Sequence, residues 1–199
     1  MSRAQLAARW AAALFAAALL PRAVLCADAE AGRQKAQTCV ACHGAEGNSL
    51  NPAVPSLAAQ PAQFIAMQLY QFREGNRKDA QMTPMAANLS NADMNDLAAY
   101  FSAQKAAAPT RKADASKAAE AKRLAEQNHC VQCHGPALAG QQHIPRLAGQ
   151  QFEYLRAQLR GFKASTRADL DGNMTSAAQA LSAADIDVLA DYLAALAAP

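Results

Sequence analysis

A six-residue pattern that occurs twice is the strongest constraint on this chain. The pattern Cys-x-x-Cys-His-Gly spans residues 39–44 and again residues 130–135. Two cysteines three residues apart with a histidine directly after the second are the attachment signature of a c-type haem. Each cysteine adds to one haem vinyl group as a thioether, and the histidine then lies beneath the iron as its proximal ligand. The pattern therefore predicts two covalently bound haem c groups, attached through Cys39, Cys42, Cys130 and Cys133 and ligated by His43 and His134.

Two other uses of paired cysteines are less consistent with the sequence. A Cys-x-x-Cys pair can be a dithiol redox motif, and two such pairs can form a tetrahedral zinc site. Zinc ribbons usually separate their pairs by about 15 to 20 residues, whereas nearly the length of a domain separates these two. Neither alternative explains a histidine directly after both pairs. Haem attachment is therefore the favoured interpretation, with zinc and redox thiols as the alternatives.

The two motifs belong to a longer internal repeat, which indicates one structural unit used twice. The first unit spans residues 30–104 and the second unit spans residues 116–199. A linker at residues 105–115, rich in alanine and lysine, joins them and contains Pro109, which is expected to end any helix that continues from the first unit. The excess of positive charge in the linker predicts a solvated connection between two domains.

Helical periodicity recurs at matching places in both units. Ile65, Leu69 and Phe72 follow i, i+4, i+7 spacing. The second unit repeats this stripe with Leu155, Leu159 and Phe162. Ser90 and Ser182 are candidate N-caps of the last helix in each unit, each followed three residues later by an aspartate. No stretch shows strand-like alternation, so the sequence predicts an all-α fold of two tandem domains related by internal duplication.

An Arg-x-Asp sequence also recurs, at residues 77–79 and 167–169, in what we expect to be a loop. Further back in each unit, Pro55 and Pro145 occupy matching places after the cysteine motifs. A carbonyl group there could accept the ring N–H of the proximal histidine and fix its tautomer. A proline that only stiffens the loop explains the same pattern equally well.

The repeat also selects the sixth ligand of each iron. Methionine on the distal side raises the reduction potential, because its soft thioether favours ferrous iron. The second half contains only Met174, seven residues before the Leu-Ser pair that precedes the last helix, and Met82 has the same spacing from its own Leu-Ser pair. Met85 would correspond to Ala177, which cannot ligate iron. We therefore predict Met82 and Met174 as axial ligands, with Met85 as the alternative in the first unit.

Four further side chains compete for iron less well. Met67 and Met94 lie at helical spacing among apolar residues, so we expect them in the core. His129 and His143 could in principle provide bis-histidine ligation. However, the first unit has no histidine at the matching places, so we expect these two at the surface or at a haem edge.

The N-terminus is typical of an export signal over residues 1–29. Arg3 and Arg9 precede an apolar run that is shorter than a typical membrane span, and Ala27-Asp28-Ala29 resembles a cleavage site. An uncleaved signal anchor is the alternative. Cys26, the odd cysteine, lies on the segment to be removed, and a large residue precedes it, which argues against lipidation. An exported chain whose other cysteines all lie in haem motifs needs no disulfide bonds.

The composition bears on the cofactor and on the partners. The chain is 52% hydrophobic but only 6% aromatic, and much of its apolar content is alanine. Cores of this kind are thin, so a buried macrocycle in each half would supply apolar area that the side chains lack. Removal of the signal leaves the basic and acidic side chains nearly balanced, and the haem propionates then make the holoprotein mildly acidic. This balance argues against a nucleic-acid-binding protein.

With these features in place, the sequence resembles the cytochrome c4 family of dihaem cytochromes c over nearly all of the mature chain. The resemblance rests on residues 39–49, 55–60 and 82–90 and on their counterparts in the second half. It implies two class-I-like cytochrome c domains packed through a haem-to-haem interface, with His/Met ligation in both. It also implies that Pro55 and Pro145 hold the ligand histidines, and that the protein is a periplasmic or membrane-associated carrier.

Two departures from the family's pattern concern the second unit. Residues 140–143 replace the Gly-Asn-Ser that follows the first haem motif. Gly32 could allow the first and last helices of the first unit to cross closely, whereas its counterpart Arg123 cannot do so in the same way. We therefore expect the second unit to pack differently, and the order of the two reduction potentials is left open.

The function expected from these features is one-electron transfer at each iron, from a quinol-oxidising complex toward a haem-copper terminal oxidase. Two saturated axial positions argue against an enzyme, because catalysis on peroxide or oxygen needs an open coordination site. The expected partners are redox proteins, with no nucleic acid and no small-molecule substrate, and with peripheral membrane association as an option. One alternative is the dihaem cytochrome subunit of a flavocytochrome of the sulfide dehydrogenase type. A dihaem peroxidase is a further one, disfavoured by the matched methionines.

Overall fold

The computed structural model describes residues 27–112 and 114–199. The predicted export signal over residues 1–29 therefore lies almost wholly outside the described residues, and Cys26 does so entirely. Asp28 and Ala29, at the predicted cleavage site, are the N-cap and the first residue of the first described helix. The backbone N–H of Asp28 also donates to Asp96 Oδ1 at 2.8 Å, so this residue is tied to the first unit.

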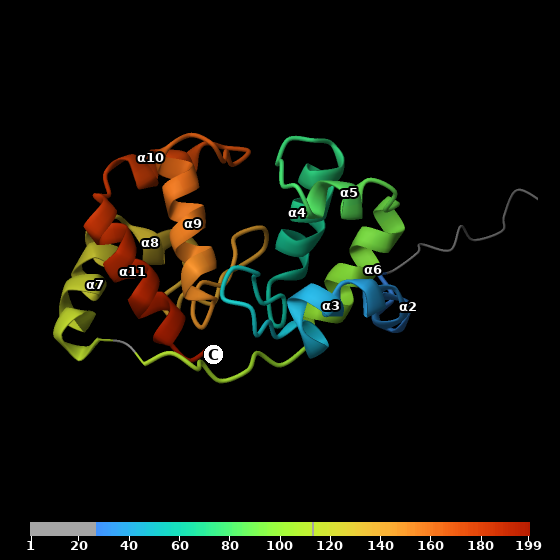
Figure 1. Ribbon diagram of the computed structural model, residues 1–199, viewed down its shortest axis with the longest axis horizontal. Coiled ribbons are helices and arrows are strands. Elements are labelled where there is room, and N and C mark those ends of the chain that lie inside the picture. Colours follow the sequence, from blue (N-terminus) through green and yellow to red (C-terminus); the bar gives the residue numbers. More distant parts are fainter. Residues whose placement is uncertain (1–26, 113) are drawn as a thin grey trace, which may run out of the picture.

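The described residues form short α-helices, which follow the same order in each half (Figure 1), and two 3-10 helices in the first half. The first half contains α2 (Ala29–Lys35), η2 (Ala36–Thr38), α3 (Val40–His43), η3 (Ala45–Gly47), α4 (Ala62–Arg73), α5 (Met82–Ala86) and α6 (Asn91–Ser102). The second half contains α7 (Ala115–Gln127), α8 (Cys130–His134), α9 (Phe152–Lys163), α10 (Asn173–Gln179) and α11 (Ala183–Ala195). Within the described part of the chain, the only β pairing is an isolated bridge between Gln141 and Ile144. The prediction of an all-α fold is confirmed.

The predicted N-caps of the last helices are present. Ser90 caps α6 and Ser182 caps α11, and each serine forms a capping box with the aspartate three residues later. The serine oxygen accepts from a free N–H of the first turn, and the carboxylate accepts from the serine backbone N–H, so both donors are satisfied. These boxes fix where the last helix of each unit begins.

Each unit has its own small core, built from the predicted helical stripes. In the first unit Ile65 of α4 packs with Leu97 and Phe101 of α6, and the half-buried Cys39 lies against this cluster. In the second unit Leu155 of α9 packs with buried residues of α11. Half-buried side chains that pack against the second-unit clusters include Cys130, Phe152, Leu159 and Tyr192. The cysteine that opens each haem motif is thus part of the core wall.

The first and last helices of the first unit cross at Gly32, as the sequence predicts. A Cβ atom at this position would lie 2.0 Å from the backbone oxygen of Asp96 and 2.9 Å from Tyr100 Cβ. The counterpart Arg123 is exposed and pairs with Glu120 instead. The second unit avoids the clash because Arg123 points outward and other residues of α7, Leu124 and Ala125, face α11.

We expect Gly32→Ala to destabilise the first unit by about 2 to 4 kcal/mol, because a backbone carbonyl cannot yield to the added methyl group without moving a helix. Denaturant unfolding of the holoprotein, followed by far-UV circular dichroism, measures the change. Arg123→Ala at the counterpart position is the matched control and should change stability by less than about 0.5 kcal/mol. Equal stability of Gly32→Ala and the parent would contradict the close crossing.

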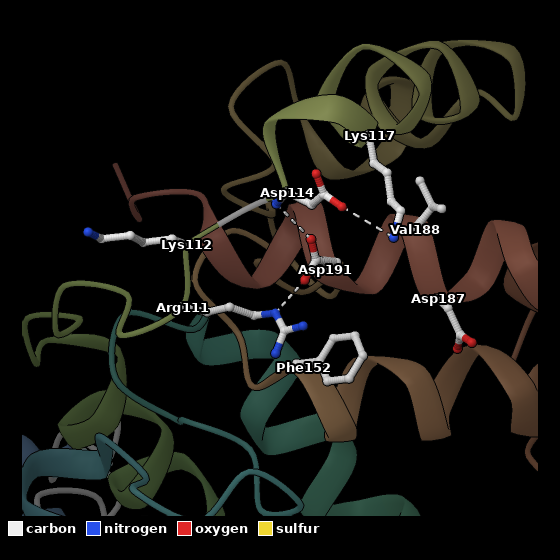
Figure 2. A pocket seen from close by; sticks show the side chains of 8 residues that line it. All are labelled: Arg111, Lys112, Asp114, Lys117, Phe152, Asp187, Val188 and Asp191. Carbon is white, nitrogen blue, oxygen red and sulfur yellow. Dashed lines mark hydrogen bonds and ion pairs between the residues drawn. The ribbon is translucent and has the colours of Figure 1, made fainter.

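The linker is more firmly attached than the predicted solvated connection. Arg111 pairs with Asp191 of α11 at 2.5 Å, and its guanidinium carbon lies 4.0 Å from the centroid of the Phe152 ring. Figure 2 shows this arrangement and the surrounding pocket, which is lined by charged side chains of the linker, α7 and α11 and by Phe152 and Val188. At the other end, Asn48 bonds to the backbone of Lys105 and of Ala107. An ion pair and hydrogen bonds hold the linker against both units. The net charge of the linker does not predict such contacts.

A seam of hydrogen bonds joins the two units directly, through the loops that precede α4 and α9. These two helices and the loops before them lie in the middle of the molecule (Figure 1). Gln60 Nε2 donates to the backbone oxygen of Arg146 at 3.0 Å, and the Arg146 backbone N–H donates to Gln60 Oε1 at 2.9 Å. In the mirrored arrangement, the Ser56 backbone N–H donates to Gln150 Oε1 at 2.8 Å and Gln150 Nε2 donates to the Ser56 backbone oxygen at 2.9 Å. Equivalent residues exchange equivalent bonds, so the two units are related by an approximate twofold axis.

Candidate haem sites

The proximal histidines are buried and held in one orientation. His43 ends α3 and His134 ends α8, and only 5% and 3% of their surfaces are exposed. Nδ1 of His43 lies 2.8 Å from the backbone oxygen of Pro55, and Nδ1 of His134 lies 2.8 Å from that of Pro145. A carbonyl oxygen can only accept, so Nδ1 carries the proton and donates it. Nε2 is then the unprotonated nitrogen of each ring, which is the form that ligates a metal.

The protonation of both rings favours ligation. Burial lowers the pKa of His43 and of His134 below the ordinary value, and the bond to the proline carbonyl only partly opposes this. Both imidazoles are therefore neutral at pH 7. The expectation that Pro55 and Pro145 support these histidines agrees with the contacts.

The four motif cysteines differ in exposure. Cys39 and Cys130 are half-buried against the cores, whereas Cys42 and Cys133 are exposed. Burial raises the pKa of the Cys39 and Cys130 thiols. In residues 27–112 and 114–199, no three His, Cys, Asp or Glu side chains come together as a metal site. The two cysteine pairs thus do not converge, and the zinc alternative, which needs four ligands around one ion, lacks support.

The predicted methionine ligands lie at equivalent, braced positions. Met82 is the first residue of α5 and its backbone N–H donates to Asp79 Oδ1 at 2.9 Å. Met174 lies in the first turn of α10 and its backbone N–H donates to Asp169 Oδ2 at 2.8 Å. Both methionines are half-buried, whereas Met85 is 50% exposed. The geometry favours Met82 over Met85.

Sequence reasoning missed the role of the two aspartates. Asp79 and Asp169 hold the start of the helix that carries each predicted methionine, and Asp169 also accepts from the backbone and the hydroxyl of Thr175. Burial acts to raise the pKa of Asp169, but these hydrogen bonds outweigh it and lower the pKa. The available signal was the aspartate of the recurring Arg-x-Asp sequence, which lies three residues before Met82 and five residues before Met174.

Of the remaining candidates, Met94 and the two histidines lie where the sequence placed them, whereas Met67 is not fully buried. Met94 is 3% exposed in the first core, and Met67 is half-buried on α4. His129 and His143 are exposed, in agreement with a surface role. His129 adopts a left-handed backbone conformation with φ of 56° directly before Cys130, and its ring contacts Gln132.

These residues fit a c-type haem in each unit. The neutral imidazole offers Nε2, two thiols on one turn can each form a thioether, and a half-buried methionine offers a soft sulfur ligand. Each half contains two cysteines, one histidine and one methionine of this kind, at positions that correspond in the internal repeat.

Comparison with known proteins agrees with this arrangement. The family model described as cytochrome c matches residues 29–105 and again residues 118–197. Cytochrome c4 of Pseudomonas aeruginosa is 37% identical over 179 residues, which cover 85% of this chain and 89% of that protein. A protein described as a thiosulfate dehydrogenase electron acceptor, from Thiomonas intermedia, is 38% identical over 173 residues, covering 81% of this chain and 79% of that protein. The crystal structure of reduced recombinant cytochrome c4 from Pseudomonas stutzeri superposes with a TM-score of 0.79 at 34% identity, covering 85% of this chain and 98% of that one.

Proposed function

The chain belongs to the cytochrome c4 family of dihaem cytochromes c, and from that premise we propose that it relays single electrons from a quinol-oxidising complex toward a haem-copper terminal oxidase. As a member of this family, the chain is a dihaem electron-transfer protein, and it binds two haem c groups covalently. The observation that carries the proposal is the repetition of one braced set, a carbonyl-held histidine and an aspartate-held methionine, in both units.

The proposal assigns each residue a role. Four cysteines would form the thioethers: Cys39, Cys42, Cys130 and Cys133. The iron ligands would be His43 and Met82 in the first unit and His134 and Met174 in the second. The prolines that support the two histidines are Pro55 and Pro145. The haem irons supply the reversible one-electron chemistry. If His43 and Met82 in one unit, and His134 and Met174 in the other, bind the iron from its two sides, no position would be left where a substrate could bind to the metal, which supports an electron carrier and not an enzyme.

The chain's own contribution is to keep the ligand sets rigid. The Pro55 and Pro145 carbonyls fix the imidazole orientation, and Asp79 and Asp169 fix the backbone at the methionines. Rigid ligands move little when the charge changes, so the reorganisation that slows electron transfer stays small. The reciprocal bonds of the seam hold the units in one orientation, which supports a relay between two sites of fixed separation.

We place the protein in the periplasm, because the N-terminal sequence is typical of an exported chain. None of the helices among the described residues is long and apolar enough to cross a membrane. Peripheral association with the membrane surface is part of the same proposal. The domain boundaries proposed are residues 30–104 and 116–199, with the linker at residues 105–115.

A second candidate function comes from the relatives. The protein from Thiomonas intermedia that is described as a thiosulfate dehydrogenase electron acceptor is about as similar to this chain as the cytochromes c4 are. The same dihaem carrier could therefore receive electrons from a thiosulfate-oxidising enzyme instead of a quinol-oxidising complex. The flavocytochrome subunit suggested by the sequence is a third role, and it requires a tightly bound flavoprotein.

The experiment is to purify the holoprotein from a periplasmic extract, count haem per chain, and record its oxidised and reduced spectra. We expect two haems per chain and the weak near-infrared band of methionine bound to ferric iron. The reduced protein should then be oxidised rapidly by membranes that contain a haem-copper oxidase. Reduction by thiosulfate with a thiosulfate dehydrogenase, but not by membranes with quinol, would favour the second candidate. Co-purification with a flavoprotein would favour the third function. A high-spin haem that turns over peroxide would contradict all three of the proposed electron-carrier functions.

A further inference from the structure

The seam reaches the proximal histidine of the second unit through a single peptide group. The backbone oxygen of Pro145 lies 2.8 Å from His134 Nδ1 and accepts its proton, and the N–H of the same peptide group belongs to Arg146. That N–H donates to Gln60 Oε1, on a side chain of the first unit, at 2.9 Å. Two hydrogen bonds and one peptide group therefore form a continuous chain from the histidine of one unit to a glutamine of the other.

The first unit has the same chain with the partners exchanged. The backbone oxygen of Pro55 lies 2.8 Å from His43 Nδ1, and the Ser56 N–H of that peptide group donates to Gln150 Oε1 of the second unit at 2.8 Å. Gln60 and Gln150 occupy matching places in the internal repeat. Each unit thus contributes one glutamine to the support of the other unit's proximal histidine.

Both glutamines are held with the side-chain oxygen toward the peptide N–H. Nε2 of Gln60 donates to the Arg146 backbone oxygen at 3.0 Å, and Nε2 of Gln150 donates to the Ser56 backbone oxygen at 2.9 Å. A backbone N–H can only donate and a carbonyl oxygen can only accept, so an amide turned the other way would lose both bonds. Each glutamine is 3% exposed, so little water competes for these groups.

The two halves share this backbone contact although the side chains beside it differ. The Ser56 hydroxyl accepts from the Ser49 N–H, whereas the Arg146 guanidinium donates to the backbone oxygen of Ala58. A serine and an arginine thus serve the seam in unlike ways. What the duplication has kept in both units is the glutamine bond to the peptide group that holds the proximal histidine.

This chain of bonds acts on the electron density at the iron. A peptide N–H that donates a hydrogen bond makes the carbonyl oxygen of its own peptide group a stronger acceptor, because bonds in a chain polarise one another. A stronger acceptor draws the Nδ1 proton away from the ring and makes Nε2 a better electron donor to the metal. A better donor stabilises ferric iron. The glutamine bond therefore lowers the reduction potential of the haem in the opposite unit.

We propose that Gln60 and Gln150 are positioning residues that act across the seam, Gln60 on the second haem and Gln150 on the first. Neither is an iron ligand, and each acts through one peptide group and one histidine. The inference rests on the proposed haem sites. It goes beyond the proposed relay, because it makes the potential of each haem depend on a side chain of the other unit.

The test is a spectroscopic redox titration of the holoprotein with Gln60→Leu and Gln150→Leu, in which leucine fills similar space without polar atoms. We expect the ratio of reduced to oxidised second haem at a fixed applied potential to rise about threefold in Gln60→Leu, with the first haem unchanged. Threefold is about 28 mV, since tenfold is about 59 mV for a one-electron couple. Gln150→Leu should give the crossed result. Met82→Ala and Met174→Ala, each of which removes one proposed ligand, assign the two potentials to the haems.

Gln151→Leu is the matched control for a weaker seam. Gln151 Nε2 also donates across the seam, to the Ser49 backbone oxygen at 2.6 Å, but it bonds to neither proximal peptide group. This variant should raise neither potential. A seam that merely opens admits water, and a more polar surrounding favours ferric iron, so the potential would fall. Unchanged potentials in both Gln60→Leu and Gln150→Leu, a fall, or a shift confined to the haem of the mutated unit would overturn the proposal.

The ring proton of each histidine reports the same bond directly. Low-spin ferrous haem is diamagnetic, so the Nδ1–H resonances can be followed by proton NMR of the reduced protein. We expect the His134 resonance to move to lower frequency in Gln60→Leu and the His43 resonance to do so in Gln150→Leu. Gln150 Oε1 also accepts from the Gln151 N–H, so if Gln150→Leu fails to accumulate, Gln60→Leu decides. Two haems per chain with the near-infrared methionine band in each variant keep this result separate from any failure of the proposed function.

Discussion

Met174→Ala lowers the reduction potential of the second haem by on the order of 100 mV or more, which changes the equilibrium between the oxidised and reduced forms by about 50-fold or more. Met82→Ala has the same effect on the first haem. The thioether is a soft ligand that favours ferrous iron, and its removal admits water or hydroxide, which favour ferric iron. Redox titration gives the potentials, and the near-infrared band of methionine-bound ferric iron should fall by about half in each variant, because each carries one of the two ligands.

Met85→Ala is the matched control for the first unit. Met85 is 50% exposed and lies on the same helix, α5, as Met82. We expect its removal to leave the band and both potentials unchanged. A loss of the band in Met85→Ala, with the band retained in Met82→Ala, would show that the repeat selects the wrong methionine. Loss in neither variant would place a different ligand on the first iron.

The internal repeat explains why much of this architecture could be predicted from the sequence. A duplicated unit allows each position to be tested against its counterpart, and residues such as Met174 and Ser182 identify Met82 and Ser90 by spacing alone. The capping boxes are likewise local, since each depends on a serine and an aspartate three residues apart. Local chemistry of this kind is visible in a linear sequence.

The seam could not be predicted, because its contacts join residues that are far apart in the chain. Gln60 bonds to Arg146 and Gln150 to Ser56 through backbone atoms, for which residue type carries no signal. The docking of Arg111 on Asp191 depends in the same way on how the two halves meet. The linker therefore looked solvated in the sequence, although its arginine is specifically bound.

We expect the double variant Cys130→Ala/Cys133→Ala to lose one of the two haems and the folded structure of the second unit with it. Both clusters of the second core include Cys130 at their edge, and their buried side chains are mainly alanine and leucine. Without the macrocycle these helices bury too little apolar area to offset the loss of chain entropy. Haem absorbance per chain should fall by about half and the far-UV helical signal by a similar fraction, while the first unit keeps its spectrum, since separate cores unfold separately.

Gln132→Ala is the matched control, because Gln132 is exposed and lies between the two cysteines. It should retain both haems and the full helical signal. Cys39→Ala/Cys42→Ala should produce the mirrored result, with the first unit unfolded and the second intact. If either cysteine variant keeps its complete helical signal after losing one haem, the side chains alone suffice to build that core. The haem would then be a redox group only, and the reason for attaching it covalently would have to be found in the control of its potential and not in folding.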